Sequence, residues 1–265
     1  MEFNVGLIDA LCDIVAAIKP QLAFYEALGP EGALVLKLTL DYAKAKGMYV
    51  ICDGKRNDIG STAKAYSAAY LGTVIVGKTE LFAFDADALT VNPYLGSDGI
   101  KPFIEAAEKN DKAIFALVKT SNQSAGELQD LVAFTKKEAD STDKPATDLP
   151  VYAIIGDLME SISLHTTGRH GFTRVGAVVG ATYPEEIEYL RNRLKNTFFL
   201  VPGYGAQGGS ASDVARAFNE DGHGAVVNAS RSIITAWKTT GLDYGKAARD
   251  EALRMRDELR KALYR

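Results

Sequence analysis

Residues 50–66 read VICDGKRNDIGSTAKAY, and this stretch contains the sharpest change of character in the chain. An apolar run ends in Asp53-Gly-Lys-Arg-Asn-Asp58, which places four charges within six residues, and a helical pattern follows at once. A turn from a strand into a helix can be made with Gly, Asn and a single charge. The stretch is therefore either a solvated corner or a group of charges placed there for chemistry.

Short apolar runs like the one before Asp53 recur along the whole chain. They are nearly continuous, as expected for parallel strands that are covered on both faces. The predicted strands are DIVAAIK (13–19), MYVICD (48–53), DALTVN (87–92), AIFALVK (113–119), VGAVVG (175–180), FFLVPG (198–203) and GAVVNA (224–229).

Helical patterns separate these runs. Leu34, Leu38 and Tyr42 recur at intervals of four within residues 32–46, and Gly47 is a stop signal. Further helices are predicted at residues 151–164, 184–194 and 243–263. Strands that alternate with helices indicate parallel βαβ units. A closed (β/α)8 barrel needs eight strands, whereas a doubly wound sheet can take seven, so the seven visible runs leave both architectures open.

The composition of the chain is that of an ordinary globular protein, with 47% hydrophobic and 24% charged residues. The length of 265 residues fits one α/β domain over 1–265, and residues 135–150 are predicted to be a solvated excursion from it. A net charge of −4 offers no basic field for nucleic acid. No apolar run approaches the ~20 residues that span a bilayer, and acids stand where a signal peptide has bases. We therefore expect a cytoplasmic protein without membrane contact.

The cysteines and histidines carry no metal-binding pattern. Cys12 and Cys52 both lie in apolar segments, which favours packed, reduced thiols over a disulfide or a metal pair. The histidines form no ligand constellation. They are His165, His170 and His223.

Polar or Gly-rich sequence follows nearly every predicted strand, where parallel folds collect their binding groups. Asp53 and Lys55 are two residues apart and project to the same side of an extended chain. Lys19 ends the first predicted strand, and Asp58 could be a helix N-cap. Together these four charges could form an alternating network at a barrel mouth, with perturbed pKa values, or only an exposed ion-pair corner.

Two further segments are candidate binding loops. In PGYGAQGG (202–209), glycines let backbone amides approach an oxyanion, although a tight loop would also need them. Arg231 stands one strand later, and the loops after the last two barrel strands often form a phosphate site. KTSNQSAG (119–126) offers hydroxyls and an amide for the edge of a polar heterocycle, or it is a capped turn.

These segments, in this order, resemble the orotidine 5′-phosphate decarboxylase family over nearly the whole chain, and most closely its longer bacterial branch with a KPQ segment. The stretches that carry the resemblance are AAIKPQLAFYEALGPEG (16–32), DGKRNDIGST (53–62), TVNPYLGSD (90–98), VKTSN (118–122), VGAVVGATYPEE (175–186), PGYGAQGG (202–209) and NASRSI (228–233).

The resemblance implies a TIM barrel that works as a homodimer without a metal or an organic cofactor. It implies decarboxylation of orotidine 5′-monophosphate to UMP and CO2, the last step of UMP biosynthesis, with Lys55 as the proton donor. In the same charge network it places Lys19, Asp53 and, from across the dimer interface, Asp58. It assigns substrate contacts to Ile59 and Thr62 in the partner's site, Ser121 at the pyrimidine, and Gln207 and Arg231 at the phosphate.

The chain departs from this family at its start. The family's first strand, which carries an Asp that contacts the ribose, comes before the KPQ segment, whereas MEFNVGLIDA resembles the helix after that strand. Asp9 and Asp13 lie on this helical pattern and do not replace the ribose contact. We therefore expect seven of the eight strands and an open seam with two unpaired edges. Either the sequence begins at an internal methionine or it is a natural truncation with impaired activity.

Two alternative functions follow from these features. A missing strand is compatible with a non-catalytic or impaired remnant that still binds nucleotides. The DxKxxD pattern is also similar to that of Mg²⁺-dependent sugar-phosphate decarboxylases and hexulose-phosphate synthases, but the TSN and PGYGAQGG segments speak against those relatives.

Overall fold

The main sheet of the molecule contains all seven of the strands predicted from the apolar runs. The computed structural model of the chain describes residues 1–134, 148–205 and 208–264. The strands of this sheet are β1 (Ala17–Ile18), β2 (Tyr49–Arg56), β5 (Ala88–Val91), β6 (Ala113–Lys119), β9 (Val175–Val179), β10 (Phe199–Pro202) and β11 (Ala225–Asn228).

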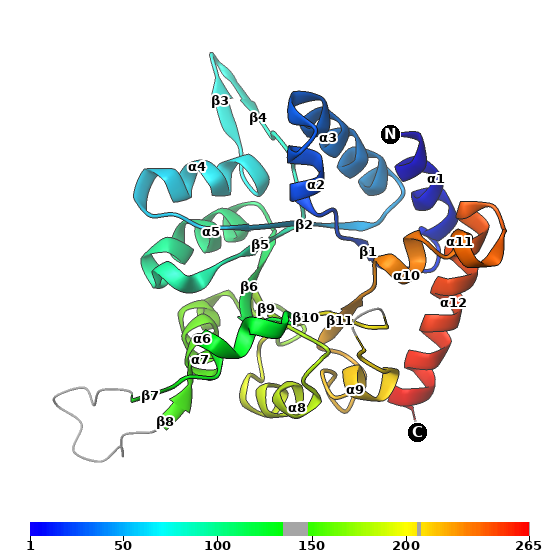
Figure 1. The fold of residues 1–265 in the computed structure, drawn as a ribbon. Coiled ribbons are helices and arrows are strands. Elements are labelled where there is room, and N and C mark those ends of the chain that lie inside the picture. The colour runs from blue at the N-terminus through cyan, green and yellow to red at the C-terminus, as the bar shows by residue number, and fades with distance from the viewer. Residues whose placement is uncertain (135–147, 206–207, 265) are drawn as a thin grey trace, which may run out of the picture.

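All neighbouring strands of this sheet run parallel and follow one another in chain order, from β1 to β11. A doubly wound sheet would reverse its order at a switch point. The unbroken strand order therefore excludes the doubly wound sheet and indicates a curled, barrel-like sheet. Figure 1 shows the helices arranged around its outside.

The helices connect these strands and cover them. They are α1 (Glu2–Leu11), α2 (Leu22–Glu26), α3 (Gly29–Ala45), α4 (Gly60–Tyr70), α5 (Ser97–Lys109), α6 (Gly126–Gln129), α7 (Val151–Ser163), α8 (Pro184–Arg193), α9 (Ala211–Ala215), α10 (Arg231–Ile234), α11 (Trp237–Thr240) and α12 (Tyr244–Leu263). Short 3-10 turns are η1 (Pro93–Leu95), η2 (Gln123–Ala125) and η3 (Leu164–Thr166). Within the described ranges, no helix is both long and apolar enough to cross a bilayer.

Among the described residues no strand joins the two edge strands, β1 and β11, so the sheet is open between them, as expected from seven predicted strands. A groove of about 380 Å³ lies there, and both edges line it, with Ile18 from β1 and Val226 from β11. Helix α1 packs against α12 beside this groove, so the first and the last helix of the described chain lie side by side (Figure 1). Leu7 and Met255 of these two helices form part of the groove wall.

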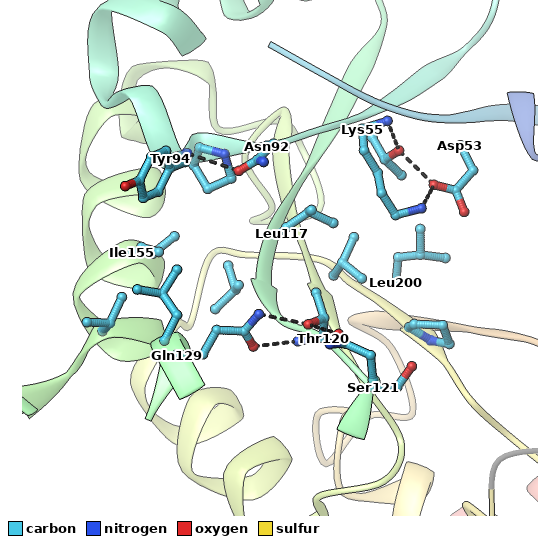
Figure 2. Close-up of a pocket in the computed structure, with 18 of the residues that line it drawn as sticks. Asp53, Lys55, Asn92, Tyr94, Leu117, Thr120, Ser121, Gln129, Ile155 and Leu200 are labelled. Atoms are coloured by element: carbon cyan, nitrogen blue, oxygen red, sulfur yellow. Dashed lines mark hydrogen bonds and ion pairs between the residues drawn. The ribbon is translucent and has the colours of Figure 1, made fainter. Parts of the chain in front are cut away.

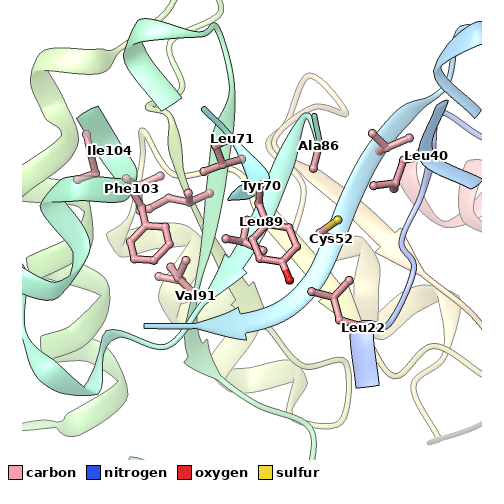
Figure 3. Packing of buried hydrophobic residues seen from close by; sticks show 14 of the residues in the cluster. Leu22, Leu40, Cys52, Tyr70, Leu71, Ala86, Leu89, Val91, Phe103 and Ile104 are labelled. Carbon is pink, nitrogen blue, oxygen red and sulfur yellow. The ribbon is translucent and has the colours of Figure 1, made fainter. Parts of the chain in front are cut away.

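Alternation along each strand builds an inner and an outer apolar layer. Ile51, Phe115 and Leu200 belong to the layer inside the curled sheet. Their neighbours along the strands face the helices, and Figure 3 shows this outer layer around Cys52, Leu89 and Phe103. Full burial of a side chain such as Phe103 stabilises the fold by about 1.5–3 kcal/mol relative to exposure.

Two predicted elements differ from the structure. The first predicted strand shrinks from residues 13–19 to Ala17–Ile18, because the N–H groups of Ile14 and Val15 both donate to Leu11 O in a turn after α1. In α3 the predicted apolar face is wrong, since Leu34 is 60% and Leu38 is 44% exposed. The buried face carries Leu36, Leu40 and Ala43 instead.

Two hairpins outside the main sheet were not predicted. Strands β3 (Val74–Val76) and β4 (Thr79–Leu81) pair antiparallel across the two residues Gly77 and Lys78, and this hairpin projects from the body in Figure 1. The β-branched run Val74–Val76 followed by the Gly-containing turn Gly77-Lys78 would have been its signal. Strands β7 (Val132–Phe134) and β8 (Asp148–Pro150) form the other hairpin, so the end of the predicted excursion is a strand. Residues 135–147 of that excursion lie outside the described residues.

Both cysteines are free thiols, as predicted, but their surroundings differ. Cys52 is fully buried in β2, and burial raises the pKa of its thiol to about 12. Because the thiolate is the reactive form, we expect a disulfide reagent at pH 8 to modify only Cys12, which is partly exposed. Counting modified thiols before and after denaturation measures this. Rapid modification of Cys52 in the folded protein would contradict the packing of β2.

Candidate active site

A pocket of about 610 Å³ opens at the carboxyl ends of the strands, a size typical of small-molecule sites. Its wall takes residues from six of the seven main strands or the loops that follow them (Figure 2). The polar residues that line it are Lys19, Asp53, Lys55, Thr90, Asn92, Thr120, Ser121, Asn122 and Gln129. Aliphatic side chains such as Leu117 and Leu200 form its floor.

A bulge in β2 brings the charges of the DGK segment into this pocket. Cys52 pairs with Leu89 and Arg56 pairs with Val91, so four steps along β2 oppose two steps along β5. Lys55 has a φ of +48°, a left-handed conformation that is uncommon for a residue with a side chain. The prediction that Asp53 and Lys55 share an extended backbone is therefore wrong, although both side chains reach the same place. Strained backbone of this kind is typical of functional sites.

Asp53 is the centre of a network of charges. Lys19 Nζ donates to Asp53 Oδ2 over 2.5 Å, and Lys55 Nζ donates to Asp53 Oδ1 over 2.6 Å. Burial of Asp53 opposes its ionisation, but the two lysines outweigh this effect and hold the pKa of the carboxyl below its usual value. Asp53 is thus a carboxylate at neutral pH. The Lys55 side chain remains 44% exposed, so its ammonium is accessible to a ligand.

Thr90 fixes this network and was not predicted as a site residue. Its hydroxyl donates to Asp53 Oδ1 over 2.9 Å and accepts the N–H of Lys55, also over 2.9 Å. Thr90 is 1% exposed and follows Ala88 on the inner face of β5. A polar side chain at an inward position of an apolar strand is the signal that could have identified it.

Ser121 follows β6 and lies against β9 at the edge of the same pocket. Gly180 N–H donates to Lys119 O over 2.7 Å, which draws the two strand ends together. A Cβ added to Gly180 would lie 2.8 Å from the Ser121 Cβ and from its backbone nitrogen. Only glycine at position 180 therefore lets Ser121 occupy this position.

Three predicted residues stand apart from the pocket, at the start of α4. Ile59 and Thr62 are exposed, and none of Asp58, Ile59 and Thr62 lines the pocket. The alternative assignment of Asp58 as a helix N-cap is wrong, because Ile59 occupies that position and Asp58 Oδ1 accepts the Ile59 N–H. These side chains are therefore displayed on the surface of this chain.

The predicted phosphate loops lie side by side. Pro202 of β10 pairs with Asn228 of β11, so the segments that follow these residues leave the sheet together. A Cβ added to Gly205 would lie 3.9 Å from Ser232 Oγ, next to the exposed Arg231. Gln207 lies outside the described residues, so its predicted position stays a prediction.

Sequence comparison identifies the family of this chain. The family model described as "Orotidine 5'-phosphate decarboxylase / HUMPS family" matches residues 2–240. The chain belongs to this family. It is 44% identical to an orotidine 5′-phosphate decarboxylase of Rhodopirellula baltica over 237 residues, which cover 89% of this chain and 73% of that protein. The enzyme of Clostridium perfringens strain 13 is 40% identical over 263 residues, 98% of this chain and 84% of the relative.

A solved structure of the decarboxylase family has the same architecture. The structure of Leishmania donovani OMP decarboxylase superposes with a TM-score of 0.75 at 29% identity, and the match covers 100% of this chain and 88% of that chain. The curled parallel sheet and the pocket at its carboxyl edge are therefore the fold of an orotidine 5′-phosphate decarboxylase. In the parts of this family member that the structure describes, no group of three or more His, Cys, Asp or Glu side chains is arranged to hold a metal ion.

Proposed function

We propose that this protein decarboxylates orotidine 5′-monophosphate to UMP and CO2, as the last step of UMP biosynthesis. The observation that carries the proposal is the ammonium of Lys55, which Asp53 holds at the mouth of the pocket in a member of the decarboxylase family. A carboxy-lyase of this kind needs a cation beside a carbon that becomes negative.

The geometry of the network fits that chemistry. When the bond from the pyrimidine carbon to the carboxylate breaks, its electron pair stays on the ring carbon and CO2 departs. The exposed Nζ of Lys55 stabilises this developing charge and then delivers a proton to the carbon. Asp53, ionised and bound to both lysines, holds the ammonium in place before the reaction begins. Thr90 holds the Asp53 carboxylate and the Lys55 backbone, so the donor is preorganised.

The remaining substrate contacts are assigned by their place around this centre. Ser121 lies at the pocket edge and serves the pyrimidine. Arg231 and Gln207 serve the phosphate, because their loops follow the neighbouring strands β10 and β11. Phosphate binding is remote from the bond that breaks, and its binding energy favours the orientation of the substrate.

The surface residues at the start of α4 support a homodimer with shared active sites. Ile59 is 54% exposed and Tyr94, at the rim of the pocket, is 74% exposed. Exposed apolar and aromatic side chains of this kind fit an interface with a second copy of the chain, which would bring Asp58, Ile59 and Thr62 into the partner's pocket. We assign residues 1–265 to a single barrel domain, and a cytoplasmic location stays a prediction.

One observation favours the impaired alternative. Lys19 lines both the pocket and the groove between β1 and β11, so the open edge of the sheet adjoins the charge network. A site that is open on this side admits water beside Lys19, and this water weakens the electrostatic interactions within the charge network.

Conversion of orotidine 5′-monophosphate to UMP tests the proposal. We expect turnover by the purified protein, followed as loss of substrate absorbance, and the same rate after treatment with EDTA. Loss of activity in EDTA, with recovery on addition of Mg²⁺, would favour the metal-dependent sugar-phosphate relatives. Binding of UMP without any turnover would support the nucleotide-binding remnant and reject the enzyme.

A further inference from the structure

Lys119 is a fully buried lysine that the decarboxylation chemistry does not use. It ends β6 with 0% exposure. Along β6, Ala113, Phe115 and Leu117 face the interior of the curled sheet, so alternation alone would turn Lys119 inward as well. A register shift between Leu117 and Lys119, relative to β9, reverses this direction. The side chain therefore leaves the interior and lies towards α7.

The ammonium of Lys119 is held on this outer side by three partners. It forms an ion pair with Asp130, just after α6. Its Nζ also lies 4.6 Å from the ring centroid of Tyr183 and 5.2 Å from that of Tyr152, within the range of cation–π attraction. Removing the lysine charge from water is costly, so an ion pair of a buried lysine is weak evidence of a contribution to stability.

The ion pair is one of two adjacent bridges across the same loop. Next to it, Gln129 Oε1 accepts the Thr120 N–H over 2.9 Å, and Gln129 Nε2 donates to Thr120 Oγ1 over 2.7 Å. Residues 119 and 120 are thus tied to residues 129 and 130. The segment between them, which begins with Ser121, is a closed loop with both ends fixed at the pocket wall (Figure 2).

We propose that Lys119 and Asp130 are positioning residues for base recognition: their ion pair fixes the loop of residues 121–128 so that Ser121 meets the pyrimidine. This inference rests on the proposed function. It assigns the pair no contact with the substrate. The loop has no other ion pair across its base among the described residues, and a side chain at position 180 would collide with Ser121.

The test compares Lys119→Met with Lys112→Met. Methionine resembles the apolar stem of lysine but lacks the ammonium, and Asp130 is 46% exposed, so water can solvate its released carboxylate. Lys112 is a matched control, because it is also buried, precedes the same strand at its opposite end, and pairs with Asp85 and Asp87 over 2.8 and 3.4 Å. Lys44 also pairs with both of these carboxylates, so they keep a partner in the control.

The readout is the dissociation constant of two ligands by calorimetry, UMP and ribose 5-phosphate, which lacks the base. We expect Lys119→Met to raise the dissociation constant of UMP about 3- to 30-fold, the loss of affinity typical of one or two hydrogen bonds. The dissociation constant of ribose 5-phosphate should not change. The KM for orotidine 5′-monophosphate should rise by a similar factor. Lys112→Met should change the dissociation constant of neither ligand. Equal weakening of the binding of both ligands, or no change in UMP binding, would overturn the proposal.

A second variant covers the case in which Lys119→Met does not fold. In Asp130→Asn the amide oxygen still accepts a hydrogen bond from Lys119 but has no charge. We expect a smaller loss that is again confined to UMP, and a loss shared by ribose 5-phosphate would count against the pair. Because binding is measured without turnover, absence of decarboxylation in the unmodified protein rejects the proposed function and leaves this comparison valid.

Discussion

Replacement of Lys55 by alanine is expected to reduce decarboxylation by about 10⁴-fold or more while leaving UMP binding nearly intact. The variant removes both the cation that stabilises the ring carbanion and the proton donor, and each role contributes about 10²–10⁴-fold. It also leaves the Asp53 carboxylate with Lys19, over 2.5 Å, and the Thr90 hydroxyl, over 2.9 Å, as its partners. Steady-state kinetics with orotidine 5′-monophosphate, combined with calorimetry of UMP, measures both effects.

A matched control separates this effect from a general loss of lysine. Lys37→Ala removes a lysine from α3 that pairs with Asp41 on the surface, and it should leave kcat and KM unchanged. The left-handed backbone at position 55 is retained in Lys55→Ala, since Thr90 still accepts the N–H of that residue. Substantial turnover by Lys55→Ala would show that another group donates the proton, and the assignment of the active site would be wrong.

The sheet could be predicted from the sequence because its strands are apolar on both faces. Each of the seven runs contains a strand. Residues of these parallel strands pack into apolar layers on both faces of the sheet, so each strand appears in the sequence as a nearly continuous apolar run. The order of the strands could not be predicted from seven runs. It depends on hydrogen bonds between strands, and the local pattern does not contain that information. The short hairpins were missed for a related reason, since three-residue strands leave too little periodicity.

Polar residues at the ends of predicted strands could be expected from the sequence to lie near one another. Lys19, Asp53, Lys55 and Ser121 all line the same pocket, as the carboxyl ends of parallel strands require. What the sequence could not show is the path of the backbone at the bulges. The bulge in β2 puts Lys55 in a left-handed conformation, and the register shift in β6 turns Lys119 outward. The alternation of side chains along a strand predicts which face of the sheet a side chain lies on only where the strand pairing is regular.

Mixing two inactive variants is expected to restore activity if the active sites are shared between subunits. Lys55→Ala lacks the proton donor in its own barrel, and Asp58→Ala lacks the carboxylate that we propose reaches the partner. We expect Asp58→Ala alone to reduce the rate of decarboxylation by about 10²-fold, as for other lost electrostatic contacts. In a mixed dimer, one pocket combines the intact Lys55 of one subunit with the intact Asp58 of the other. The second pocket carries both defects.

Each mixed dimer has one complete site out of two, so roughly half of the wild-type activity per dimer should return. Co-expression with two affinity tags, followed by kinetics on the doubly purified dimer, measures this recovery. The matched control combines Lys55→Ala with Asp53→Ala, because both residues belong to the same barrel and both pockets stay defective in every mixed dimer. Recovery in this control, or none in the Asp58 pair despite mixed dimers, would contradict the shared site. Asp58 lies outside the pocket of its own chain, so a second copy is the direct way to bring its carboxylate to Lys55.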